Sequence, residues 1–182
     1  MLFAIFFSTS GFASERYKID PDHTFSSFEY NHWGLSMQRS RFDRTSGFIE
    51  LDQATGTGEI DIEIDAASVN TGTELFNKAL RSSDFFDVEK YPTIRFTSSR
   101  LIFDGENLKQ VEGELTIKDV TRTVTLELTN FNCRFMLIYG KRACGANGFV
   151  NILRSDYNIG RYVPFVSDAV TLYIIVEAIK EY

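Results

Sequence analysis

Histidine, proline and cysteine are scarce in this sequence, with two, three and two residues among 182. Both histidines lie in the segment DHTFSSFEYNHWG, residues 22–34. From Ser26 to His32 this segment alternates with the two-residue period of a half-buried strand. A strand rises about 3.3 Å per residue, whereas a metal binds its ligands at about 2 Å. Unless the chain reverses at Ser26–Ser27, His23 and His32 cannot share one ion, and we expect no metal site.

Clusters of positive charge are missing as well. The net charge is −6, the pI is about 5.0, and the Lys and Arg residues are dispersed along the chain. A nucleic-acid surface needs clustered positive charge. We therefore expect no nucleic-acid partner.

Long apolar runs are also missing, so no segment is expected to span a membrane. The first thirteen residues, MLFAIFFSTSGFA, are apolar but too short for a span. Gly11 and Ala13 occupy the −3 and −1 positions of a signal-peptidase site before Ser14, although no Lys or Arg precedes Arg16. An apolar strand or a buried terminal helix fits less well, because charge begins abruptly at Glu15. We predict a signal peptide over residues 1–13 and one exported domain over residues 14–182.

Motifs of the common enzyme classes are absent from the sequence. It contains no G-x-S-x-G elbow, no HExxH, no phosphate-cradling glycine loop and no dinucleotide fingerprint. A Ser–His–Asp arrangement is left open, because its members need not be neighbours in sequence. We predict a protein that is not an enzyme. A periplasmic hydrolase and a partner protein of a membrane quinone-dependent redox enzyme are the alternatives.

Phenylalanine, by contrast, is abundant, with seventeen residues. So many rings need a large core or a cavity to line. Most of the chain after residue 17 alternates as strands with one face in water do, most clearly in three segments: 58–69, 113–128 and 170–180. Within 113–128 we expect a hairpin whose turn gives Asp119 a positive φ. Evenly spaced antiparallel strands predict a barrel or a sandwich, and periodicity alone does not separate the two.

One segment, residues 71–88, breaks the two-residue period. Its sequence TGTELFNKALRSSDFFDV spaces Leu75, Phe76, Ala79 and Leu80 along one face of a helix. Thr71 and Glu74 have the spacing of a capping box. We expect a helix that covers one end of the sheet structure.

The two cysteines flank a predicted hairpin whose turn contains Gly140. If Cys133 and Cys144 face each other across the strands they can form a disulfide, worth about 3 kcal/mol by the loop-entropy argument. Zinc ligation is the alternative, but the two-residue spacing of cysteine ligands and a nearby histidine are missing. We predict the disulfide.

Several segments form an ordered set over essentially the whole chain after residue 16: YKIDPDHT (17–24), NHWGLSMQRSRFD (31–43), SVNTG (68–72), LRSSDFFDVEKYPTIRFTS (80–98), GELTIKDVTRTVTLEL (113–128), RSDYNIG (154–160) and VTLYIIVEAIK (170–180). Together they resemble the YceI-like family of periplasmic polyisoprenoid-binding proteins. The resemblance implies a lipocalin-type barrel of eight antiparallel strands with a helix near its mouth. It also implies a periplasmic protein that is often dimeric and holds a long apolar molecule inside. We expect no cofactor besides this bound lipid.

The resemblance has gaps near the expected mouth. Asn77 and Ala79 stand where many relatives carry Asp and His. Arg134 to Met136 replace the His-Pro that follows the first Cys in many members of the Cys-paired branch, and Asp119 stands where relatives usually have Gly. These departures leave the head group of the ligand open.

The resemblance and strand parity nominate residues that line the barrel and bind the lipid. The inward face of the first long strand supplies three of them: Phe28, Tyr30 and His32. Further candidates follow by parity or motif: Trp33, Phe42, Ile62, Ile64, Phe96, Leu115 and Phe149. Phe85 and Phe86 would close the helical end, and polar groups at the mouth would orient a head group: His32, Arg41 and Arg81. The plainer alternatives are that these rings are ordinary core, that His32 is a buried hydrogen-bonded histidine, and that Arg81 forms a surface pair with Asp84.

Overall fold

The computed structural model describes residues 14–52 and 55–182. The predicted signal peptide, residues 1–13, lies outside the described residues. Most of what is described is strand, and within it no helix is long and apolar enough to cross a membrane.

Eight antiparallel strands form a closed barrel: β1 (Glu15–Ile19), β4 (Thr45–Asp52), β5 (Thr57–Asp65), β7 (Thr93–Asp104), β8 (Asn107–Ile117), β9 (Val120–Met136), β10 (Lys141–Leu153) and β11 (Ala169–Lys180). The ring closes at β1, where Tyr17 lies opposite Ile49 of β4 and Lys180 of β11. Two facing sheets would leave this pairing unmade. The structure therefore confirms the predicted eight-stranded barrel.

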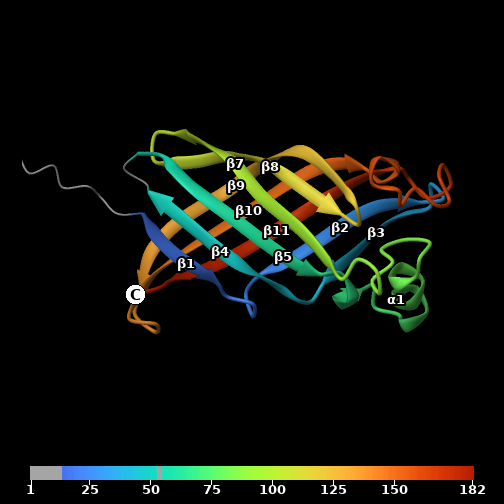
Figure 1. Ribbon diagram of the computed structural model, residues 1–182, viewed down its shortest axis with the longest axis horizontal. Coiled ribbons are helices and arrows are strands. Elements are labelled where there is room, and N and C mark those ends of the chain that lie inside the picture. The colour runs from blue at the N-terminus through green and yellow to red at the C-terminus, as the bar shows by residue number, and fades with distance from the viewer. Residues whose placement is uncertain (1–13, 53–54) are drawn as a thin grey trace, which may run out of the picture.

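Three further strands extend the barrel beyond the ring at one end: β2 (Phe25–His32), β3 (Ser36–Phe42) and β6 (Val69–Asn70). After a short turn β2 continues the path of β1 along β11, with Phe28 opposite Leu172, and β3 pairs back onto β2. The same end carries the helix α1 (Glu74–Arg81), and the C-terminus lies at the opposite end (Figure 1). Two short 3₁₀ helices, η1 (Ala66–Ser68) and η2 (Arg154–Tyr157), lie in the connections.

The predicted strand faces are confirmed by burial. Ile62 and Ile64 of β5 point into the core, as do Leu115 of β8 and Val170 and Ala178 of β11. The hairpin turn between β8 and β9 differs from the expectation. Lys118, the first of its two turn residues, has the positive φ of 58°, and Asp119 does not.

The helix is present but shorter than the predicted segment, and a different side of it is buried. Leu75 and Phe76 are 75% and 56% exposed, whereas Asn77 is buried. Asn77 Oδ1 accepts hydrogen bonds from the Thr71 backbone N at 2.7 Å and from Thr71 Oγ1 at 2.9 Å. These bonds fix the buried side of α1 through polar contacts, which the apolar spacing did not reveal. The capping box was wrong, because the N-cap is Thr73 and Thr71 bonds to Asn77 instead.

The predicted disulfide is confirmed. Cys133 and Cys144 lie directly opposite each other in the β9–β10 ladder and are joined by an S–S bond of 2.03 Å. Gly140 lies in the turn that follows, with a φ of 61°. The bond joins the two strands where β9 has passed the end of its pairing with β8.

Gly113 of β8 allows close packing of an aromatic ring inside the barrel. A Cβ at this position would lie 2.6 Å from Phe96 Cζ and 2.5 Å from the Thr97 carbonyl oxygen. The ring of Phe96 therefore occupies the space that any larger residue at 113 would need.

Gly113→Ala is expected to lower the free energy of unfolding by about 1 to 3 kcal/mol, because the added methyl forces Phe96 and the strand apart. Chemical denaturation measures the change. Gly145→Ala is the matched control, since its Cβ would meet nothing nearer than 3.7 Å. Equal stability of the two variants would contradict the close packing at Gly113.

Candidate ligand-binding cavity

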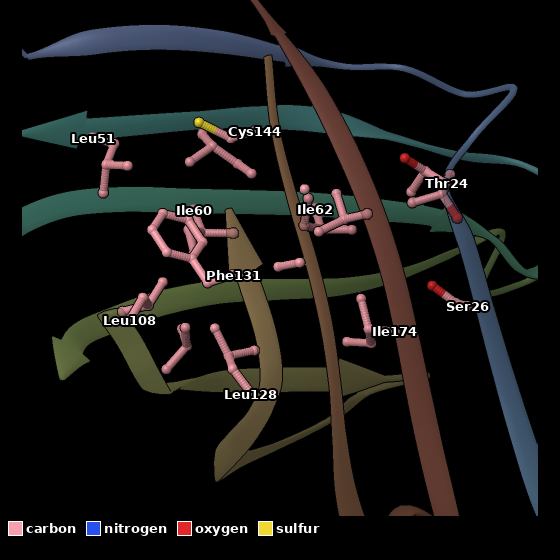
Figure 2. A pocket seen from close by; sticks show the side chains of 16 residues that line it. Thr24, Ser26, Leu51, Ile60, Ile62, Leu108, Leu128, Phe131, Cys144 and Ile174 are labelled. Atoms are coloured by element: carbon pink, nitrogen blue, oxygen red, sulfur yellow. The ribbon is translucent and has the colours of Figure 1, made fainter. Parts of the chain in front are cut away.

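An apolar cavity of about 70 Å³ lies inside the barrel. Its walls come mainly from aliphatic side chains of β4, β5, β8, β9 and β11, with one aromatic ring from β9, and no charged residue among the described residues lines it. Figure 2 shows part of this wall: Ile60, Ile62, Leu108, Leu128, Phe131 and Ile174. Such a lining excludes water and offers an oily molecule contacts without direction.

Three hydroxyl side chains interrupt the apolar wall. They belong to Thr24, Ser26 and Thr45, and all three are buried. Thr24 Oγ1 donates to the Glu177 carbonyl at 3.2 Å and accepts from the Glu177 N–H at 3.2 Å. The hydroxyl oxygens of Ser26 and Thr45 have no hydrogen-bond partner in the described part of the chain.

A cluster of three aromatic rings fills the interior toward the α1 end. The ring of Phe28 lies 5.7 Å from Phe42 and 6.3 Å from Phe86, and Phe42 lies 5.4 Å from Phe86 between ring centroids. All three residues are buried. We call this cluster the aromatic plug. It brings together three of the residues nominated from sequence, and Phe86 closes this end from the segment after α1.

The other nominated residues fall into different places. Ile62 lines the cavity, and three more are buried in the surrounding core: Ile64, Phe96 and Leu115. Phe85 is half-buried beside Tyr162. Whether any of these residues contacts a ligand stays a prediction.

Residues 30 to 33 extend past the ring of the barrel with the β2–β3 hairpin. Tyr30 and His32 are half-buried, and Trp33 is 55% exposed and stacks on Phe165 at 4.6 Å between ring centroids. Tyr30 stacks on Phe28 of the aromatic plug at 6.1 Å between ring centroids, and none of these three side chains lines the cavity.

Phe149 takes the outward position on β10, contrary to the parity expected for it. The buried positions of this strand are Cys144, Gly148, Val150 and Ile152, so the intervening Phe149 points to the outer face, where it lies opposite Tyr173. The inward face of β10 is built from small residues at 144 to 148, which a search for large apolar residues overlooks.

The arginines expected at the mouth are engaged elsewhere. Arg41 pairs with Asp43 on the surface. Arg81 Nε donates to the Ala67 carbonyl at 2.9 Å, and its Nη1 lies 3.3 Å from a Glu74 oxygen. The sequence alternative that paired Arg81 with Asp84 was wrong, because Asp84 pairs with Arg161. Arg81 thus ties α1 to η1.

The two histidines make different contacts. His23 Nδ1 lies 2.9 Å from Asp20 Oδ2, and this carboxylate raises the pKa of His23 above its usual value. His32 makes a backbone bridge to Val166. Over residues 14–52 and 55–182, no three His, Cys, Asp or Glu side chains gather closely enough to hold a metal ion.

Comparisons with known proteins identify the family. Residues 17–178 match the YceI-like domain. Protein YceI of Escherichia coli is 32% identical over 181 residues, which cover 98% of this chain and 94% of that protein. The chain belongs to the YceI-like family.

Solved structures agree with this YceI-like fold. BcnA of Burkholderia cenocepacia superposes with a TM-score of 0.73 at 24% identity, over 87% of this chain and 98% of the other. A polyisoprenoid binding domain from Saccharophagus degradans superposes with a TM-score of 0.68 at 19% identity, over 91% of this chain and 98% of the other.

Arg154 organises the connection between β10 and β11 in this YceI-like chain, and sequence reasoning missed it. Its buried guanidinium donates to four backbone carbonyls: Ile159 at 2.7 Å, Ser167 at 2.9 Å, Val166 at 3.0 Å and Arg161 at 3.3 Å. Burial lowers the pKa of Arg154, and Asp168 opposes that effect. The RSDYNIG segment was the available signal, but nothing in its pattern shows that Arg154 turns inward to the backbone.

Arg154→Met is expected to lower the free energy of unfolding by about 2 to 4 kcal/mol, because it removes hydrogen bonds to buried carbonyls and leaves them unpaired. Proteolysis should also become faster within residues 158–168. Denaturation and limited proteolysis measure both effects.

Arg161→Met is the control for this prediction, because Arg161 lies on the same connection but pairs with Asp84 at the surface. It should change stability little. If the two variants behave alike, the connection does not depend on Arg154.

The pKa of Tyr157 in η2 predicts that the protein loses stability at alkaline pH. Burial raises its pKa to about 12, with a smaller contribution from Asp156. An unfolded tyrosine titrates near pH 10. Because the folded pKa is the higher one, the contribution of Tyr157 to the stability of the fold is complete below about pH 10 and is lost as the pH rises toward 12. Tyr157→Phe should remove the part of the alkaline loss of stability that comes from Tyr157. The part that comes from Tyr17, whose pKa burial also raises, should remain.

At neutral pH Tyr157→Phe should leave stability unchanged or slightly higher, because the buried hydroxyl has no hydrogen-bond partner among the described residues. Denaturation at several pH values measures both quantities. A substantial loss at neutral pH would show that this hydroxyl does have a partner.

Proposed function

We propose that this protein binds a long-chain apolar lipid, of polyisoprenoid, prenyl-quinone or fatty-acyl type, inside the barrel and carries it without catalysis. The observation that supports this most directly is the closed ring of strands around a cavity with no charged lining. A lipid tail in this position leaves water completely.

The energy of binding would come from transfer out of water. Each buried methylene contributes about 0.8 kcal/mol, so a tail of about twenty carbons gains well over 10 kcal/mol before entropy costs. Burial has no preferred direction. Selectivity among long tails should therefore be weak, and a head group must supply what selectivity there is.

The size of the cavity requires the interior to open when a lipid enters. At about 70 Å³ it is smaller than ordinary ligand pockets, which span about 300 to 1,000 Å³. The walls are mainly Leu, Ile and Val, whose rotamers can change without breaking hydrogen bonds. The aromatic plug is packed ring against ring, so the aliphatic part of the interior is the part that widens.

Family membership supports the same function, and the polyisoprenoid binding domain of Saccharophagus degradans shares this fold. A periplasmic location is supported by the signal-peptide pattern of residues 1–13 and by the Cys133–Cys144 disulfide, since disulfides persist in oxidising compartments. A homodimer stays a prediction.

A hydrolase has no specific support from the cavity. A nucleophilic hydroxyl needs a neighbouring base, and neither His, Asp nor Glu lines the cavity beside Ser26 and Thr45. His23 and His32 lie elsewhere. No surface of the described residues specifically favours a partner protein of a redox enzyme.

Ile62→Trp tests the proposal, because it places a large ring in the cavity wall. Protein purified under native conditions should yield a prenyl or acyl lipid on organic extraction and mass spectrometry. The variant should yield less than about one fifth of that amount, since the ring occupies the space the tail needs.

Ile175→Trp is the matched control, because Ile175 lies on the exposed face of β11. It should retain the native amount of lipid, and Leu128→Trp offers a second cavity variant if Ile62→Trp does not fold. Undiminished lipid in a folded cavity variant would place the ligand outside the barrel.

A further inference from the structure

Two hydroxyl groups in the cavity lack hydrogen bonds. Ser26 is 6% exposed and Thr45 is 4% exposed, both line the cavity, and neither hydroxyl oxygen has a partner in the described residues. A hydroxyl buried among apolar atoms without a partner is costly. Native proteins rarely keep such groups unless something binds them.

The neighbouring Thr24 shows that a hydroxyl in this wall can be paired within the protein. Its oxygen donates to and accepts from the backbone of Glu177. Ser26 lies two residues further along the same chain path, on the same inward face, yet its hydroxyl is left without such a bond. The difference marks Ser26 and Thr45 as groups available to a ligand.

These hydroxyls lie at the plug end of the cavity. Ser26 is opposite Phe42 of the aromatic plug in the β2–β3 ladder, and Thr45, the first residue of β4, follows Phe42 by three residues. In Figure 2, Ser26 lies at one side of the cavity, while Leu108 and Phe131 lie at the other. A ligand held at Ser26 and Thr45 would extend its tail along the aliphatic wall, away from α1.

The lining also restricts the charge of the head group. Within residues 14–52 and 55–182, no Lys, Arg or His lines the cavity, so a phosphate or carboxylate there would lose its hydration without gaining a counter-charge. A hydroxyl both donates and accepts a hydrogen bond. Ser26 and Thr45 can therefore pair with an alcohol or with a carbonyl oxygen of a quinone.

We propose that Ser26 and Thr45 form the head-group site of the barrel and bind the oxygen of an uncharged lipid, a prenyl alcohol or a prenyl quinone. The proposal rests on lipid binding inside the barrel. It assigns the head group to the interior and not to Arg41 and Arg81, which do not line the cavity, and it excludes polyprenyl phosphates from this site.

The test compares three ligands that share one tail: geranylgeraniol, geranylgeranyl diphosphate and the corresponding hydrocarbon without oxygen. Affinities are measured by competition against a fluorescent prenyl probe. The native protein should bind the alcohol about tenfold more tightly than the hydrocarbon. It should bind the diphosphate more weakly than the alcohol.

Removing the two hydroxyls should abolish the preference. In Ser26→Ala/Thr45→Val the affinities for alcohol and hydrocarbon should become equal, and the fold should be no less stable, since no hydrogen bond within the protein is lost. Thr171→Val is the matched control, because the Thr171 hydroxyl donates to Asn151 Oδ1 at 2.7 Å and does not line the cavity. It should keep the preference for the alcohol.

The outcomes separate this site from lipid binding in general. A hydrocarbon bound as tightly as the alcohol by the native protein, or an unchanged preference in the double variant, overturns the head-group site and leaves the barrel as the lipid site. Tightest binding of the diphosphate overturns it as well. Failure of all three ligands to bind overturns both proposals.

Discussion

The short strand β1 closes the barrel, and the interior exists only because it does. Its backbone pairs with β4 on one side and with β11 on the other, although these partners lie far apart in sequence. Without β1, β4 and the C-terminal residues of β11, Ala178 to Lys180, would be open edges, and the apolar interior would face water between them. Ion pairs accompany the closure, among them Arg16 with Glu50 and Lys180 with Glu15, but exposed pairs contribute little. The ladder of backbone hydrogen bonds provides the closure.

The closed barrel has an interior with two kinds of packing. This division explains how the barrel can be stable and, in the proposed function, still bind a lipid. Toward α1, the rings of Phe28, Phe42 and Phe86 pack against one another and hold that end together. Toward the opposite end, aliphatic side chains surround the cavity and can rearrange at low cost. Ser26 and Thr45 lie between the two regions. In the proposed function, the aromatic plug bounds the cavity at one end, the aliphatic side chains rearrange around a lipid tail, and Ser26 and Thr45 bind its head group.

Strand periodicity predicted the strands and their buried faces, because the alternation within a single strand depends on which face is buried, whereas the eight-stranded barrel was implied by the resemblance to the YceI-like family. The inward isoleucines of β5 and the Cys133–Cys144 pairing followed from local spacing. Closure by β1 and the backbone contacts of Arg154 depend on residues distant in sequence, so no local pattern contains them. Side-chain size was a wrong guide to burial at two positions: Phe76 of α1 and Phe149 of β10 are large and apolar yet point outward. Ser26 was overlooked for the opposite reason, since a small polar residue at an inward position does not mark a site until its surroundings are known.

The central claim, that the barrel interior holds the lipid tail, is tested most directly by photo-crosslinking. A prenyl probe with a diazirine in its tail is bound to the protein and irradiated, and the modified peptides are identified by mass spectrometry. The account predicts labels on inward residues of the aliphatic wall, such as Leu128 and Ile174. Labels confined to exposed apolar residues, such as Leu35 at one end and Leu137 at the other, would contradict it.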